Sequence, residues 1–585
     1  MRKHLPIIFL LVFTALIYIS ISFQPSVLDN ADAVHAQASK EMVLRHDWVT
    51  MYVNGVRYLQ KAPLLYWLVA SAYQVFGFNA FAVRFPTVVA IVLLGWVAYL
   101  FGQWAFSQKA GLYAAAVLVS CFGMFLFTRI MIPEALLALL ITIAHFCFLR
   151  AFFGTGRAKR FYYGFYAATA LAVLTKGLIG IVFTVGPAFL FLLLTGNFSA
   201  WRQLRLLSGS ALFLAIAAPW HLLAGFRNEH FFWFYFVNEH FLRFLNKRYP
   251  VDYGKMPFHS YWLLHLVWLF PWSLGLPLLI KQLPRLQPKA DRKTQVNLYL
   301  WLWAGIILIF FSISSNQEYY TFPAYPALAL LLGAAFAEAE GGVKTKKYLL
   351  WFNGAIAAIA VVIAAVLGVL VWNARNVQAT GDLSSFLNQV SSDDERYTLS
   401  LGHLFDLTGE ALAELRGPAI SAALLLFVGF LLAFWFRKQR QHGLAMTAMV
   451  LTMGLFFICA NRAHAQFEPV LSSRVMAEEI VQRWEPGAKI VLNGNYETGS
   501  SLRFYLDQQI LLLNGRTLIM EFGSRYPDAP PIFLNYEDVR RLWRGSDRIF
   551  LFTENPKKEA LLKNLAMPVF FVAEKGGKTL FTNKQ

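Results

Sequence analysis

Apolar stretches of about 20 residues recur along most of this 585-residue chain. A helix of about 20 residues crosses a bilayer, because each residue adds about 1.5 Å and the hydrocarbon core is about 30 Å thick. Hydrophobic residues make up 57% of the chain and charged residues 15%, and the mean hydropathy is +0.49, well above that of soluble proteins. The pattern predicts a polytopic α-helical membrane protein.

Thirteen segments are candidate membrane spans. The first lacks a small-x-small cleavage site before the next polar segment, so we expect an uncleaved helix and not a signal peptide. The thirteen segments run over 5–23, 83–105, 109–129, 133–153, 161–176, 178–195, 206–224, 259–280, 296–313, 320–338, 348–372, 418–436 and 443–461.

Basic residues between the candidate spans predict the orientation of the chain. With the N-terminus in the cytoplasm, the short cytoplasmic gaps hold lysine and arginine with almost no acidic residues, as the positive-inside bias requires. These clusters hold much of the net charge of +19, so we expect membrane lipids and not nucleic acid as partners. The clusters include Arg150/Arg157/Lys159/Arg160, Arg202/Arg205, Lys281/Arg285/Lys289/Arg292/Lys293, Lys344/Lys346/Lys347 and Arg437/Lys438/Arg440.

This orientation leaves four substantial segments outside: 24–82, 225–258, 373–417 and everything after about 462. The last segment mixes charged and apolar residues as soluble proteins do, with strand-like runs at 489–492 and 548–552 after a helix-like stretch at 474–484. We therefore predict a transmembrane domain over 1–461 and a small external α/β domain over 462–585.

Polar residues gather at the predicted external ends of the spans. Ionisable groups at membrane depth are costly, so their clustering indicates a functional site. The orientation was chosen from other residues, and the position of all these groups on one side is therefore independent support for a site. The candidates are Asp29, Asp32, His35, Gln60, Lys61, Arg129, Glu134, Lys176, Glu239, His240, Arg243, Tyr319 and Tyr320.

Structural roles are an alternative for the acidic candidates. Asp29 and Asp32 fit the N-cap and N3 positions of a helix that would lie along the membrane interface on its apolar face. Glu134 follows Pro133, where an acid favours the first turn of a helix. A helix-capping role does not exclude catalysis.

The basic and aromatic candidates have alternatives of their own. Lys61, Arg129 and Lys176 could extend to lipid headgroups, and the two tyrosines could belong to an aromatic belt. The adjacent pair Glu239 and His240 could bind a divalent metal, but no further ligands accompany it. The cysteines lie inside apolar runs, which predicts neither a disulfide nor a thiolate metal site.

The order of these motifs resembles the lipid-linked glycosyltransferases of the GT-C type, and more narrowly the aminoarabinose-transferase-like branch of the protein mannosyltransferase superfamily. The resemblance covers most of the first 340 residues or so, the thirteen-span topology and the external C-terminal domain. The motifs that carry it are the acidic pair Asp29 and Asp32, Tyr58-x-x-Lys61-x-Pro63-x-x-Tyr66-Trp67, Thr175-Lys176-Gly177, Glu239-His240-x-x-Arg243-Phe244 and Tyr319-Tyr320-x-x-Pro323.

The resemblance implies transfer of a sugar from a polyprenyl (undecaprenyl) phosphate carrier to lipid A, another glycolipid or a protein. It places the chain in the inner membrane of a Gram-negative bacterium, with the N-terminus cytoplasmic and the active site and C-terminal domain periplasmic. It leaves the donor sugar and the acceptor open.

The resemblance also assigns roles to the candidate residues. The departing carrier is a phosphate anion, which fixed cations and hydroxyl donors stabilise. Asp29 matches the family's first-loop aspartate and Glu134 an acid at the start of its fourth span, and these two are the predicted catalytic carboxylates. The predicted lipid-phosphate ligands are Lys61, Lys176, Arg243, Tyr319 and Tyr320. Asp32, Gln60 and Glu239 are candidate substrate-binding residues, and His240 is a candidate ligand for a divalent metal, the one cofactor considered.

Two other functions fit the same composition. A transporter or flippase for a lipid-linked sugar would also use many spans, but transporters place polar groups near the bilayer midplane, and here the middles of the spans are nearly free of charge. In the second alternative, residues 462–585 form a binding module on a membrane anchor. Thirteen spans are far more than an anchor needs.

Overall fold

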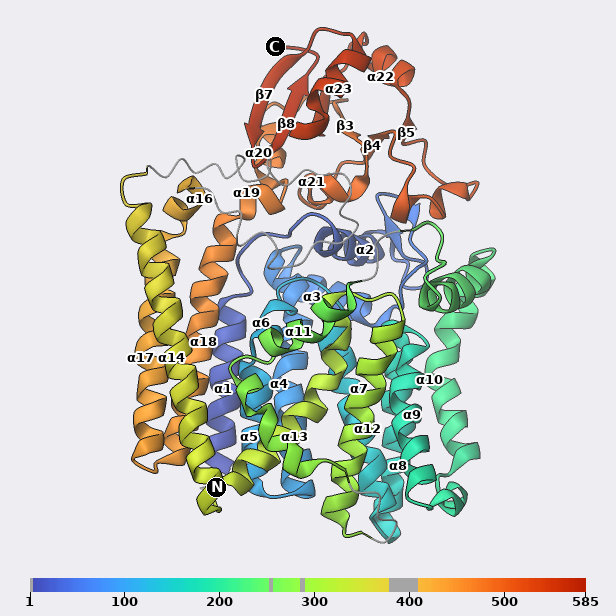
Figure 1. Cartoon of the computed structure of the whole chain (residues 1–585). Helices are drawn as coiled ribbons and strands as arrows, with labels where there is room; N and C mark the ends of the chain where they lie inside the picture. Colours follow the sequence, from blue (N-terminus) through green and yellow to red (C-terminus); the bar gives the residue numbers. More distant parts are fainter. Residues whose placement is uncertain (1–3, 252–255, 285–289, 378–408) are drawn as a thin grey trace.

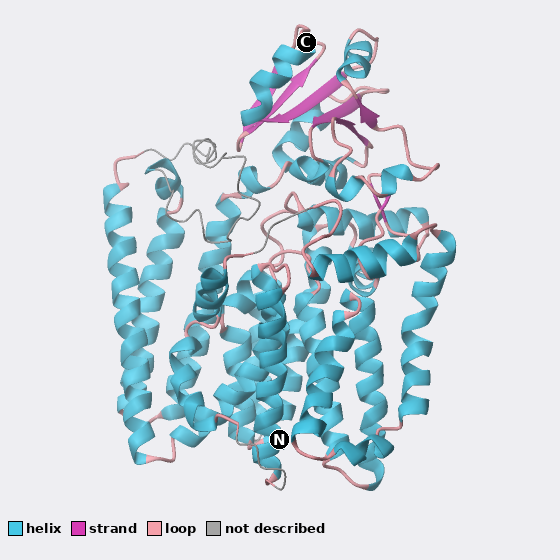
Figure 2. Cartoon of the chain, turned by 45° about the vertical axis from the view of Figure 1, so that its right-hand side comes forward, coloured by secondary structure: helices cyan, strands magenta, loops and turns pink. Residues whose placement is uncertain are grey.

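The computed structural model describes residues 4–251, 256–284, 290–377 and 409–585. Upright helices form one large bundle, and a smaller domain that contains a sheet covers one end of it (Figures 1 and 2). The bundle helices are α1 (Leu5–Ser20), α4 (Ala80–Ala105), α5 (Gln108–Ser120), α6 (Phe122–Leu126), α7 (Glu134–Phe152), α8 (Phe161–Lys176), α9 (Ile179–Leu194), α10 (Leu206–Arg227), α11 (Phe258–Trp268), α12 (Arg292–Ile313), α13 (Tyr325–Ala339), α14 (Val343–Asn373), α17 (Arg416–Lys438) and α18 (His442–Gln466).

Each predicted span overlaps one of these helices or two consecutive ones. Eight helices of the described ranges are long and apolar enough to cross a membrane, or nine if α11 and the 3-10 segment η5 (Trp272–Gln282), bent by 103°, form one span. Three further helices are apolar but shorter: α1, α9 and the helix Leu64–Phe76. The polytopic helical architecture is therefore confirmed, and the number of thirteen spans stays a prediction.

Segment 24–82 folds between the bundle and the upper domain. It contains α2 (Ala31–Arg45), a hairpin of β1 (Tyr52–Val53) and β2 (Val56–Arg57), and α3 (Leu64–Phe76). The predicted helix is present, but its N-cap is Asn30 and not Asp29, and the cap makes no side-chain hydrogen bond. Every residue from Asp32 to Met42 is buried. The prediction that α2 lies along the membrane interface on one apolar face is therefore wrong.

The C-terminal domain is an α/β domain, as predicted. Its sheet has the order β5-β4-β3-β6-β8-β7, and the two predicted strand runs form its adjacent parallel strands β3 and β6, with Lys489 opposite Ile549. The predicted helix at 474–484 is α20. The elements are α19 (Glu468–Leu471), α20 (Arg474–Gln482), β3 (Lys489–Asn493), α21 (Ser500–Leu506), β4 (Ile510–Leu513), β5 (Phe533–Leu534), α22 (Tyr536–Trp543), β6 (Ile549–Glu554), α23 (Asn555–Leu565), β7 (Phe570–Lys575) and β8 (Lys578–Thr582).

One apolar core joins segment 24–82 to the C-terminal domain. It includes Val34, Ala38 and Met42 of α2 together with Ile490, Leu492 and Phe552 of the sheet. Shared apolar burial is the main force that holds packed elements together. The C-terminal domain is therefore packed against segment 24–82 and is not joined to the bundle by the chain alone.

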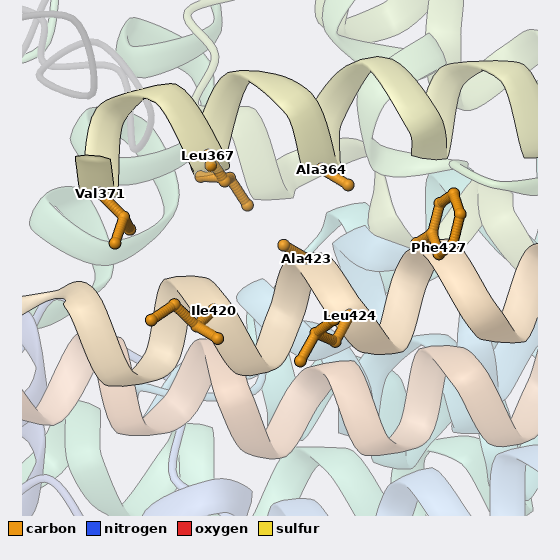
Figure 3. A pocket seen from close by; sticks show the side chains of 8 residues that line it. Ala364, Leu367, Val371, Ile420, Ala423, Leu424 and Phe427 are labelled. Atoms are coloured by element: carbon orange, nitrogen blue, oxygen red, sulfur yellow. The ribbon is translucent and has the colours of Figure 1, made fainter. Parts of the chain in front are cut away.

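The outer helices α14 and α17 enclose an apolar pocket of about 300 Å³ (Figure 3). Its lining contains no polar side chain, so it offers no group for acid–base chemistry or for binding phosphate. The lining residues are Ala364, Leu367, Gly368, Val371, Ile420, Ala423, Leu424 and Phe427.

Candidate functional site

A buried ion pair lies at the end of the bundle near the C-terminal domain. Glu134 opens α7 directly after Pro133, and Lys176 closes α8. The Lys176 Nζ pairs with Glu134 Oε1, and the Glu134 side chain is 1% exposed and that of Lys176 19%. The second carboxylate oxygen, Oε2, has no hydrogen-bond partner among the described residues. The lysine is the counter-charge of the buried carboxylate, and one carboxylate oxygen has no hydrogen bond to the described residues.

Two tyrosines face this lysine. They belong to the 3-10 segment η6 (Glu318–Ala324), which follows α12. The Lys176 Nζ lies 4.1 Å from the ring centroid of Tyr320 and 5.9 Å from that of Tyr319, and both are cation–π distances. The structure thus brings together four predicted site residues from three separate parts of the sequence.

A second charged cluster lies on the π-helix η4 (Trp233–Leu242). Glu239 accepts hydrogen bonds from Arg243 and Arg248, each at 2.8 Å. Arg248 also donates to Gln60 Oε1 at 2.8 Å. Two guanidinium groups converge on this one carboxylate. Arg243 also lies close enough to Lys176 to interact with it electrostatically. The two clusters form one cationic region, suited to an anion such as a phosphate.

His240 is held by two backbone groups. Its Nδ1 lies 2.6 Å from the carbonyl of Tyr235, which can only accept, so Nδ1 carries the proton. Its Nε2 accepts the N–H of Leu178 at 3.1 Å. Burial lowers the pKa of His240, which is therefore neutral at physiological pH. With both ring nitrogens engaged, and with no cluster of three His, Cys, Asp or Glu side chains in the described ranges, these residues do not fit the metal considered for His240.

Gly177 between α8 and α9 gives a first prediction. Its φ is +75°, and a Cβ there would lie 2.0 Å from His240 Nε2. We expect Gly177→Ala to lower the free energy of unfolding by about 1–3 kcal/mol, because the backbone conformation and the contact both exclude a side chain. Thermal unfolding of the purified protein measures it. Gly305→Ala, which has no atom within 4 Å of its added Cβ, is the control. Equal melting temperatures for the two variants would contradict the prediction.

Lys61 lies in the loop before α3, within electrostatic reach of His35 on α2. Burial, and secondarily the charge of Lys61, lowers the pKa of His35 to about 3. His35 is therefore neutral at physiological pH.

The two aspartates that follow the first span do not contact the Lys176–Glu134 pair. Asp29 Oδ1 accepts the N–H of Ser501, and Oδ2 accepts from Ser473 and Lys578, all at 2.7 Å. Asp29 is thus bound by the C-terminal domain. Its predicted catalytic role stays a prediction, since a base role would require these bonds to open.

Asp32 is bound by the segment of the bundle that precedes α7. Its Oδ1 accepts the N–H of Met131 at 2.7 Å, and Oδ2 accepts the N–H of Leu28 at 3.1 Å. Arg84 lies 3.6 Å from Oδ2. Its predicted contact with substrate also stays a prediction.

Sequence reasoning missed two arginines, Arg84 and Arg248. Arg84 is 1% exposed at the start of α4, and the rule that flags ionisable residues at span ends would have selected it. Arg248 gave no local signal, because it reaches Glu239 across a loop and follows no motif spacing.

Comparisons with known proteins agree with this architecture. Residues 60–222 match the family described as dolichyl-phosphate-mannose-protein mannosyltransferase. A curated protein of Aeromonas hydrophila, named undecaprenyl phosphate-alpha-4-amino-4-deoxy-L-arabinose arabinosyl transferase, is 29% identical over 348 residues, 57% of this chain and 60% of that one. A protein of the same name from Pseudomonas aeruginosa is 29% identical over 312 residues, 52% and 54% of the two chains. The alignments thus span between half and two thirds of the curated relatives.

The fold match extends over the whole chain. The crystal structure of ArnT from Cupriavidus metallidurans bound to undecaprenyl phosphate gives a TM-score of 0.79 at 21% identity, covering 99% of this chain and 98% of that one. Its apo form gives 0.78 at 20% identity. The chain therefore has the fold of ArnT, as the prediction of a GT-C type fold requires. The predicted resemblance to the aminoarabinose-transferase-like branch is confirmed.

Proposed function

We propose that this protein transfers a sugar from a polyprenyl-phosphate carrier to an acceptor at the end of the bundle that the C-terminal domain covers. The buried Lys176–Glu134 pair, with Tyr320 over the lysine, is the observation that carries the proposal. The names of the similar proteins, which refer to undecaprenyl phosphate and aminoarabinose, support the donor class. We place the protein in the bacterial inner membrane with this end in the periplasm.

The chemistry follows from the charges of the site. In the reaction the bond between the sugar's anomeric carbon and the phosphate oxygen breaks, and its electron pair stays on the phosphate. Lys176 and Arg243 stabilise that charge, since each is already oriented by a buried glutamate and needs little rearrangement. Tyr319, Tyr320 and Lys61 complete the proposed phosphate contacts.

The acceptor oxygen forms the new bond to the anomeric carbon. If the acceptor is a hydroxyl, its proton must leave, and the base is Glu134, whose Oε2 has no hydrogen-bond partner among the described residues. If the acceptor is a phosphate group of lipid A, it is already ionised and no base is needed. We propose lipid A as the first acceptor to test, followed by other glycolipids and proteins.

The test uses the purified full chain in lipid vesicles with undecaprenyl-phosphate-linked aminoarabinose and lipid A. We expect time-dependent formation of glycosylated lipid A, detected by mass spectrometry, and binding of undecaprenyl phosphate. Movement of the donor across the bilayer without any transfer would favour the flippase. Absence of both binding and transfer would contradict the proposal.

A further inference from the structure

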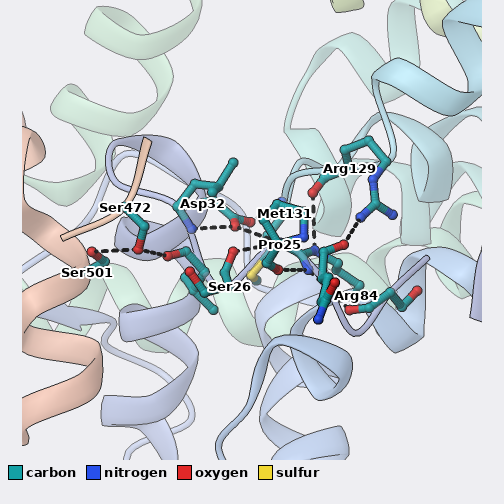
Figure 4. Close-up of polar contacts among 12 residues, drawn as sticks. Pro25, Ser26, Asp32, Arg84, Arg129, Met131, Ser472 and Ser501 are labelled. Carbon is teal, nitrogen blue, oxygen red and sulfur yellow. Dashed lines mark hydrogen bonds and ion pairs between the residues drawn. The ribbon is translucent and has the colours of Figure 1, made fainter. Parts of the chain in front are cut away.

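Two side chains of α2 form hydrogen bonds with the backbone of Met131. Its N–H donates to Asp32 Oδ1 and its carbonyl accepts from His35 Nδ1, each at 2.7 Å (Figure 4 shows the Asp32 side). Met131 and Asp32 are each almost completely buried, at 0% and 1% exposure. Hydrogen bonds shielded from water in this way hold their geometry firmly. Met131 lies three positions before Glu134.

The start of α7 has no side-chain cap, since its N-cap is Pro133 and makes no side-chain hydrogen bond. Burial of Ala135 and Leu137 and the Lys176–Glu134 pair hold the first turn from within the bundle. The segment that enters the helix holds it from the other side. Asp32 and His35 hold that segment through the N–H and the carbonyl of Met131, two positions before Pro133.

Arg84 also holds this segment. Arg84 donates to the carbonyls of Pro25 (2.6 Å), Ser26 (3.1 Å) and Arg129 (3.2 Å) (Figure 4). Its guanidinium lies 3.6 Å from Asp32 Oδ2, so the buried carboxylate has a buried counter-charge beside it. The chain before α2 and the chain before α7 thus share one buried polar network.

A helix-capping role accounts for only part of this arrangement. Asp32 lies at N2 of α2 and not at the predicted N3; its Oδ2 accepts the N–H of Leu28 just before the helix, while Oδ1 accepts the N–H of Met131 in another segment of the chain. His35 belongs to no group of three His, Cys, Asp or Glu side chains among the described residues. Asp32 and His35, three residues apart on α2, both form a hydrogen bond with Met131.

We propose that Asp32 and His35 are positioning residues: they hold Met131 so that the first turn of α7 presents Glu134 to Lys176. This inference rests on the proposed function, because it assigns the two side chains to that site. It replaces direct substrate contact by Asp32 with an action through Glu134.

A double-mutant cycle on the full chain tests the proposal. The variants are Asp32→Ala, Glu134→Gln and the double variant, with undecaprenyl phosphate binding and transfer as readouts. We expect Asp32→Ala to lower transfer about 10- to 100-fold, since small displacements of catalytic groups have effects of this size. In the Glu134→Gln background, the same change should cost less than about two-fold, because residues that act through one group are not additive.

Two further variants separate positioning from loss of fold. Asp32→Asn retains an oxygen for the Met131 N–H and should keep more transfer than Asp32→Ala. Asp47→Ala is the matched control, because Asp47 also accepts two backbone N–H groups, of Val49 at 2.9 Å and Thr50 at 3.1 Å, at another place in the same segment. Its transfer should stay close to wild type. If Asp32→Ala does not fold, His35→Ala enters the cycle in its place.

The outcomes are distinct. Full additivity of Asp32→Ala and Glu134→Gln, or unchanged transfer in Asp32→Ala, would overturn the inference while wild-type transfer upholds the proposed function. A wild-type protein that neither binds undecaprenyl phosphate nor transfers sugar would overturn both.

Discussion

Lys176→Met is expected to lower kcat/KM for sugar transfer by about 100-fold or more, the largest effect of any single substitution in the site. The substitution removes the cation that faces the departing phosphate. It also leaves Glu134, 1% exposed, without its partner. Transfer assays and undecaprenyl phosphate binding on the purified variant measure the two consequences.

The loss of charge compensation must be separated from the loss of chemistry. The double variant Lys176→Met/Glu134→Gln contains no unpaired buried charge, so we expect it to recover thermal stability but not transfer. Lys109→Met is the matched control, because Lys109 also pairs with a buried glutamate, Glu340, and belongs to a separate cluster with Arg437. Transfer by a folded Lys176→Met variant within two-fold of wild type would refute the assigned role.

Asp29→Asn is expected to lower the melting temperature and transfer together. The substitution removes the counter-charge of Lys578, which is only 8% exposed, and breaking a buried pair in this way costs about 3–5 kcal/mol. Asp528→Asn is the control, since its pair with Arg57 also joins segment 24–82 to the C-terminal domain but is exposed, and should cost about 1 kcal/mol or less. An unchanged melting temperature in Asp29→Asn would contradict the anchoring seen in the structure.

A charge swap then tests whether Asp29 also takes part in the chemistry. Asp29→Lys combined with Lys578→Asp restores an ion pair at the same place, so we expect the melting temperature to recover by more than half of its loss. Transfer that recovers with it would assign Asp29 to anchoring alone. Transfer that stays absent in the stable double variant would support the catalytic role predicted from the sequence.

The sequence predicted those features that depend on neighbouring residues. Apolar length located the helices of the bundle, and the mixed composition after residue 462 located the α/β domain with its strands β3 and β6. The cationic site was also predicted in part, because Lys176, Glu134 and Tyr320 each stand where a helix meets a polar segment.

The features that the sequence could not supply depend on distant partners. Asp29 reads as a helix cap until Lys578, 549 residues later, is seen beside it. The burial of α2 from Asp32 to Met42 has the same origin, because α21 of the C-terminal domain packs on a helix whose composition resembles that of an interfacial one. Arg248 acquires its role from Gln60, 188 residues before it.

The core shared by α2 and the C-terminal sheet has a consequence for biosynthesis. Segment 24–82 is made among the first parts of the chain, and the strands that cover it are made last. At about 5–20 residues per second, the separation of 549 residues between Asp29 and Lys578 corresponds to a delay of roughly half a minute to two minutes. During that delay the side chains of α2 that are buried in the folded protein lack their partners in the C-terminal domain. Nascent chains that stop between residues 467 and 577 carry every bundle helix but not this last contact, so the cell's quality control has an exposed surface by which to recognise them.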